Sequence, residues 1–101
     1  MATTTKALFR GAATTTVGTT LYTVPASTTT VVSSIVVTNT AASAGTFTLA
    51  LNGTAMATTV AIAANSIATF DIKQVLVATN TITGGASATT VNFHISGVEI
   101  S

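Results

Sequence analysis

The chain has 101 residues, and only five of them carry a formal charge, which leaves a net charge of +1. This length suits one domain, and the shortage of charge excludes the basic surface with which proteins bind nucleic acid or an anionic membrane. Cysteine is absent, which excludes disulfide bonds and thiolate metal sites. No apolar stretch approaches the roughly 20 residues of a membrane-spanning helix.

The amino-acid composition favours β-structure. The sequence contains 25 Thr, 18 Ala and 11 Val, and the β-branched Thr and Val lose rotamer freedom in a helix but pack well on a pleated sheet. Short runs that alternate apolar and polar residues recur between turn residues, and none has the period of a helix. We therefore predict an all-β protein: a β-sandwich, jelly-roll or immunoglobulin-like, with about seven or eight short antiparallel strands.

The first 18 residues differ from the rest of the chain. Two Thr triplets, at 3–5 and 14–16, flank Leu8, Phe9 and Arg10, so polar, low-complexity sequence surrounds one apolar and basic cluster. Two interpretations are open for residues 1–18: an N-terminal edge strand, or an arm that docks on a neighbouring subunit. For the arm, Leu8, Phe9 and Arg10 are the candidate partner-docking residues. Residues 19–101 form the predicted β-sandwich domain.

Turn residues divide the chain after residue 18 into short predicted strands. Pro25 ends the first of them, because proline cannot donate to a hydrogen-bond ladder. The strongest signal is the run VVSSIVVTN at Val31–Asn39, which suits a central strand. Alternation predicts strands over residues 19–25, 31–39, 46–51, 55–63, 67–71, 80–83 and 91–95. The side chains predicted to point inward are Phe47, Leu49, Leu51, Val60, Ile62, Phe70, Val91, Phe93 and Ile95.

Two dipeptides predict turns, and two changes of parity predict bulges. Asn52-Gly53 suits the two positive-φ positions of a type I′ hairpin, and Gly84-Gly85 predicts a flexible turn. The apolar parity changes between residues 72 and 75, where we expect a bulge or a short helical turn at Lys73-Gln74. It changes again after residue 95, where a bulge at Gly97 would return Val98 and Ile100 to the inner face.

Few side chains could carry acid–base or nucleophilic chemistry. His94 is the only imidazole, and Asp71 and Glu99 are the only side-chain carboxylates; alternation directs all three outward. The sequence has neither a G-x-S-x-G elbow nor the spacing of metal ligands. We predict no catalytic, cofactor-binding or metal-binding residue, and therefore a protein that is not an enzyme and needs no cofactor. Tyr22 is expected to be half-buried, with its hydroxyl reaching a partner.

Several stretches together resemble a module that recurs in small structural proteins of bacteriophage virions. They are Leu21–Ala26, Thr28–Asn39, Leu51–Ala55 and Val91–Ile100. The likeness covers roughly residues 19–101 and leaves the Thr-rich first 18 residues outside. It implies a virion component on the head surface, in the neck or in the tail, and it gives no residue a chemical role.

The resemblance and the composition together lead us to expect a capsid decoration or cement protein. Such a protein stabilises the shell because it binds the assembled form rather than the free subunits. Its partners would be further copies of itself, as a homo-oligomer, and other virion proteins such as the major capsid protein. The opening residues lack the apolar core of a secretory signal, so we expect synthesis in the host cytoplasm and a final place in the virion. The alternatives are a neck, tail or fibre component and, in another class, a host-surface or carbohydrate-binding module.

Overall fold

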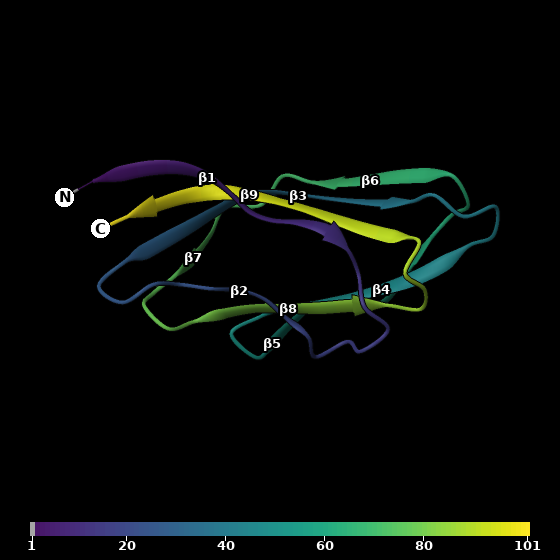
Figure 1. Ribbon diagram of the computed structural model, residues 1–101, viewed down its shortest axis with the longest axis horizontal. Coiled ribbons are helices and arrows are strands. Elements are labelled where there is room, and N and C mark those ends of the chain that lie inside the picture. The colour runs from purple at the N-terminus through teal and green to yellow at the C-terminus, as the bar shows by residue number, and fades with distance from the viewer. Residues whose placement is uncertain (1) are drawn as a thin grey trace.

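The computed structural model describes residues 2–101, which form nine β-strands in two packed antiparallel sheets (Figure 1). These residues contain no helix, and so none that is long and apolar enough to cross a membrane. The predicted all-β sandwich is confirmed, and it has one strand more than the seven or eight that were predicted. The strands are β1 (Thr3–Ala12), β2 (Thr20–Thr23), β3 (Thr29–Asn39), β4 (Gly45–Leu51), β5 (Thr54–Ile62), β6 (Ser66–Phe70), β7 (Gln74–Leu76), β8 (Thr81–Ala86) and β9 (Val91–Ile100).

The larger sheet has the strand order β1-β9-β3-β6, and β7 also pairs with β3. β6 pairs with residues 35–39 of β3 and β7 with residues 30–32, so the two short strands lie along the same edge of β3. The smaller sheet has the order β2-β8-β4-β5. Figure 1 shows the two layers and places both chain ends together, where Ala2 and Ser101 exchange backbone hydrogen bonds of 2.9 Å.

The hydrophobic core fills the space between the sheets, and Phe47 of β4 links its two sides. The Phe47 ring centroid lies 5.9 Å from that of Phe70 and 6.3 Å from that of Phe93, in tilted and edge-to-face arrangements that aromatic rings favour. Phe47 and Phe93 are buried and Phe70 is partly buried. The other most deeply buried apolar side chains are Val24, Val32, Ile35, Val37, Leu49, Ile82, Val91 and Ile95.

The hairpin between β4 and β5 turns at Asn52-Gly53, as predicted. Leu51 pairs directly with Thr54, so two residues form the loop. Asn52 has φ of 47° and Gly53 has φ of 80°, the two positive values that a type I′ turn requires.

β5 is an irregular edge strand, and one inward prediction on it is wrong. Val60 pairs with the buried Phe47, yet 37% of its surface is exposed. β5 ends the smaller sheet, so nothing within the chain covers this side chain. The register shifts between Phe47 and Leu49, where Thr59 has φ of 50° and donates its backbone N–H to Thr48 Oγ1. Ile62, the other predicted side chain, is buried.

Gly84 and Gly85 lie inside β8, so the turn predicted there is wrong. The chain turns later, at residues 87–90. A Cβ atom on Gly84 would lie 2.7 Å from Leu49 Cδ2, and one on Gly85 would lie 2.5 Å from the Thr16 carbonyl oxygen. Glycine is needed at both positions because other segments of the same chain approach the strand closely. Such a close approach is a known reason for glycine within a strand.

The bulge predicted at Lys73-Gln74 is also wrong. β6 ends at Phe70, residues 71–73 belong to no strand, and β7 then begins. Leu76 is the buried residue of β7, whereas Val75 and Val77 are 62% and 56% exposed. One parity is therefore shared by Phe70, the partly buried Ile72 and Leu76. The predicted change of parity depended on Val75 and Val77, which are exposed and do not belong to the core.

β9 has no bulge at Gly97, where we predicted one. The irregularities lie instead in β1 and β3, the two strands that flank β9. β1 shifts its register around Leu8 and β3 around Ser33, while β9 alternates without interruption. Gly97 points inward and is buried, and a Cβ there would overlap the Val31 carbonyl oxygen. Val98 and Ile100 are consequently on the outer face and not on the inner face as predicted.

We predict that Gly53→Val lowers the free energy of unfolding by about 1–3 kcal/mol, because a β-branched residue resists positive φ. Denaturant unfolding measures the change. Gly18→Val is the matched control, since Gly18 has open space around it and no positive φ. Equal stability of the two variants would contradict the type I′ turn.

We predict that Gly85→Ala destabilises the sandwich by about 1–3 kcal/mol, the usual cost of forcing an added methyl into a packed site. Gly11→Ala is the control, because its Cβ would meet only the Phe9 ring, at 3.5 Å. The two melting temperatures are compared by circular dichroism. A Gly85→Ala protein as stable as Gly11→Ala would show that residues 13–19 can move away from β8.

Candidate functional site

The side chains that the sequence offered for chemistry lie apart in the structure. His94 is on β9 with the outward parity, opposite Arg10 of β1. Asp71 lies between β6 and β7, is 87% exposed and makes an ion pair of 3.6 Å with Lys73. Glu99 has the opposite parity to His94 and points inward. Residues 2–101 contain no group of three His, Cys, Asp or Glu side chains placed to hold a metal ion.

Glu99 is the centre of a polar cluster that joins the two sheets. Its carboxylate accepts a hydrogen bond from the Tyr22 hydroxyl and forms an ion pair of 3.3 Å with Lys6 Nζ. Thr30 Oγ1 lies 2.9 Å from the Tyr22 hydroxyl oxygen; since the tyrosine hydrogen goes to Glu99, Thr30 is the donor. These four residues, the Glu99 cluster, come from β1, β2, β3 and β9. The outward direction predicted for Glu99 is therefore wrong, and the partner expected for the Tyr22 hydroxyl is confirmed.

The cluster favours the charged form of Glu99 and the neutral form of Tyr22. The hydrogen bond from Tyr22 lowers the pKa of the Glu99 carboxyl below its ordinary value of 4.5, Lys6 lowers it further, and partial burial opposes both. Burial raises the pKa of Tyr22, and the hydrogen bond to Glu99 raises it further. Tyr22 is only 8% exposed, deeper than the half-buried position expected for it. The cluster therefore acts as a structural tie between the chain ends and the smaller sheet.

The three predicted docking residues occupy different environments. Leu8 is buried in the core, and Phe9 is partly buried against it. Arg10 is exposed and pairs with His94 in the β1–β9 ladder. In a single copy both apolar side chains thus contribute to the fold, and β1 is the edge strand next to β9. Their docking on a neighbouring subunit stays a prediction, and it would require β1 to exchange these contacts for equivalent ones.

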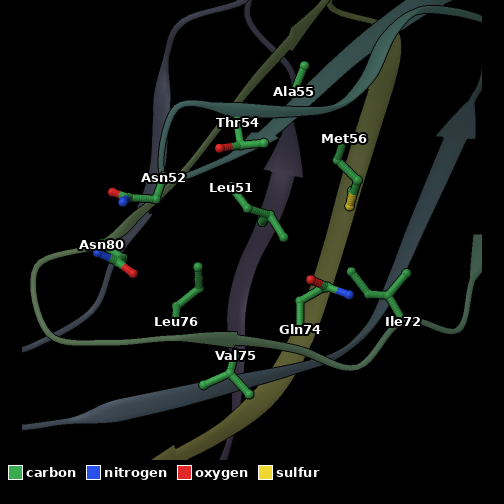
Figure 2. Close-up of a pocket in the computed structure, with 10 residues that line it drawn as sticks. All are labelled: Leu51, Asn52, Thr54, Ala55, Met56, Ile72, Gln74, Val75, Leu76 and Asn80. Carbon is green, nitrogen blue, oxygen red and sulfur yellow. The ribbon is translucent and has the colours of Figure 1, made fainter.

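An open groove of about 470 Å³ lies between the β4–β5 hairpin and the chain from Ile72 to Asn80 (Figure 2). Figure 2 shows Leu76 and Gln74 on the side of β7 that faces the hairpin, and Val75 on the opposite side. A smaller apolar hollow of about 80 Å³ adjoins the groove through Met56 and Ile72 and reaches the core residues Phe47 and Leu49. The groove is lined by Leu51, Asn52, Thr54, Ala55, Met56, Ile72, Gln74, Val75, Leu76 and Asn80.

The groove has the lining of a recognition site and offers no side chain for proton transfer. None of its ten lining residues is charged. Its polar groups are three amides and one Thr hydroxyl, and the Asn80 amide oxygen already accepts the Val77 backbone N–H at 3.1 Å. Apolar walls with a few hydrogen-bonding groups are typical of a recognition site.

The sequence matches no known protein-family model, and no curated protein is significantly similar to it.

Sequence analysis missed both the groove and the Glu99 cluster. The groove depends on which strands lie at the sheet edges, and no local pattern reveals that. The cluster could have been found: Glu99 shares its parity with Gly97 and Ile95, and only the assumed bulge directed it outward.

We predict that Glu99→Gln destabilises the protein at pH 7 by about 1.5–3 kcal/mol, the range for a hydrogen bond to a charged group. Because the folded protein lowers the pKa of Glu99, the carboxylate's contribution is full above pH 4.5 and is lost as the pH falls through the folded pKa. The difference in unfolding free energy between wild type and Glu99→Gln should therefore shrink below pH 4.5. Denaturant titrations at several pH values measure it.

Asp71→Asn is the matched control for this experiment. Both partners of its ion pair are more than three quarters exposed, so the substitution should change stability little. A Glu99→Gln protein whose deficit is independent of pH would show that the carboxylate charge is not what the cluster uses.

Proposed function

We propose that this chain is a non-enzymatic structural protein of a bacteriophage virion and that it decorates and stabilises the capsid. The resemblance of residues 19–101 to a phage structural module supports the proposal. The sandwich supplies a rigid body with surfaces for neighbours, and His94 and Asp71 lie apart from each other and from the Glu99 cluster. Acid–base and nucleophilic catalysis require such groups within hydrogen-bond reach of one another.

The observation that carries the proposal is the partly apolar edge of the sandwich, whose charged residues Asp71 and Lys73 are paired with each other. The large exposed apolar side chains on β5, β6 and the segment after it are Met56, Val60, Ile67, Val75 and Val77, which are 37% to 65% exposed. The groove opens on the same side. Exposed apolar surface of this kind marks interaction sites, and the groove, which no charged residue lines, can be buried without the desolvation cost of ions.

The stabilising effect follows from mass action. A protein that binds the assembled shell but not its free subunits shifts the equilibrium toward the shell by RT ln(1 + [L]/Kd). At a concentration about a hundred times Kd this amounts to about 2.7 kcal/mol for each site. Many copies on one shell add these contributions, so no single contact has to be strong.

Two alternatives differ from the proposal in location or in ligand. A neck, tail or fibre component would use the same apolar edge at another place in the virion. A carbohydrate-binding module would need stacking rings and carboxylates, but the chain has no Trp and no charged residue lines the groove. The groove therefore favours a protein partner over a sugar.

We predict that cryo-electron microscopy of the phage particle shows this domain on the capsid with a copy number set by the shell lattice. Met56→Lys, in the groove, should reduce occupancy at least about tenfold, the effect of about 1.4 kcal/mol, because it introduces a cation into an uncharged site. Val17→Lys is the control: Val17 is 52% exposed and lies in the β1–β2 connection. Density in the neck or tail would favour the first alternative, and absence from the particle would contradict a virion role.

A further inference from the structure

We infer that the outer face of the larger sheet is the surface through which two copies of this chain pair face to face. The inference rests on the proposed function, of which self-association is a part, and it adds the surface and the geometry. The outer face extends beyond the groove, which opens between the sheets at their edge, and the two surfaces meet at Val75, which also lines the groove.

The outer face carries an apolar row that crosses three strands. Val75 of β7 pairs with Val31 of β3, and Val31 pairs with Val98 of β9. Val75 is 62% exposed, and Val31 and Val98 are half-buried by their neighbours in the sheet. We call these three residues the valine row. Ile100 of β9 and Val77, just after β7, extend the apolar surface toward the chain ends.

The strand alternation fixes the direction of the valine row. The neighbours of Val31 in β3, Thr30 and Val32, are fully buried, and Leu76 beside Val75 is also buried. The row must therefore point away from the core. Each Val is directly opposite another across the ladder, and such β-branched pairs stabilise a sheet but still leave their outer surface in contact with water.

The placement of charged residues on this face allows a second copy to contact it. Two-fold pairing brings the same surface patch against itself, so a charge near the axis would meet its own copy. The valine row contains no charge, Lys6 and Glu99 point inward, and Lys73, two residues before Val75, is paired with Asp71. Arg10 lies opposite His94, which is four residues from Val98 and thus about 14 Å along the strand.

The area of the face is sufficient for a stable dimer. Four strands about 4.8 Å apart and ten residues of about 3.4 Å each give a surface of about 650 Å². Two such faces bury about 1,300 Å² in total, within the 1,200–2,000 Å² of specific interfaces. Two antiparallel sheets can pack in this way with their strands about 30° apart.

The edges of the sandwich are less suited to a second copy. β5 shifts its register at two places and has a positive φ at Thr59, and such irregular edges disfavour the addition of a strand. β6 and β7 have only five and three residues. The groove is concave, so it cannot match another copy of itself. The flat outer face is the self-complementary surface.

Sedimentation equilibrium on the isolated, full chain tests the inference. We expect the wild type to form dimers whose proportion rises with concentration, and Val75→Lys and Val77→Lys each to raise the dimer Kd at least about tenfold, which corresponds to about 1.4 kcal/mol. Val17→Lys, with a comparable exposure of 52% but off this face, should leave Kd unchanged. Because the chain lacks cysteine, Val75→Cys should also give an intermolecular disulfide faster than Val17→Cys.

A monomeric wild type, or a Kd that responds equally to Val75→Lys, Val77→Lys and Val17→Lys, would overturn the inference. Circular dichroism confirms that each variant is folded, and Val77 lies outside any strand, so at least one variant avoids a folding defect. A monomer that nevertheless enters particles through Val75 would show that this face binds another virion protein, and would leave the proposed function intact. A protein that dimerises through this face but is absent from particles would support the inference and contradict the proposed function.

Discussion

The inward and outward residues of β9 alternate without a break through Gly97. The positions of the Glu99 cluster and of the valine row both depend on this alternation. β9 lies between β1 and β3, and a side chain at Gly97 would collide with β3 backbone. The irregularity that this close approach demands is taken up by β1 and β3, which bulge on either side. Glu99 therefore continues the inward parity toward Tyr22, while Val98 and Ile100 continue the outward one. One glycine thus places both the Glu99 cluster and the valine row.

The small number of charges has a clear spatial order. Lys6 is paired with Glu99 at the boundary between the sheets, and Lys73 is paired with Asp71 on the loop between β6 and β7. Arg10 is the cation that remains outside these pairs within residues 2–101. The faces left over are rich in Thr, Ala and Val, which carry no charge and can be covered by another protein without the desolvation cost of ions. Such a surface suits the assembly subunit proposed above.

The sequence predicted what depends on local pattern and failed where the outcome depends on neighbours. The run at Val31–Asn39 identified β3 as a central strand, alternation identified the inner faces of β4 and most of β9, and Asn52-Gly53 identified its turn, because these signals arise within a few residues. Gly84-Gly85 was ambiguous, since glycine suits a turn and a close approach equally, and only the position of Thr16 decides between them. Val60 looks like a core residue and is exposed because β5 is an edge strand, whereas Val75 and Val77 are exposed because they have the outward parity. The groove and the valine row arise at these edges and across paired strands, where no single segment carries the signal.

β7 links the two proposed interaction surfaces. It is held by β3 through three residue pairs only; Val75 belongs to the valine row and also lines the groove, and Leu76 lines the groove as well. An isolated pairing of three residues is weak, so a contact that orders Val75 also positions Leu76. Any coupling between the two sites through β7 is reciprocal, so a partner in the groove would change pairing through the outer face by the same factor as pairing changes groove binding.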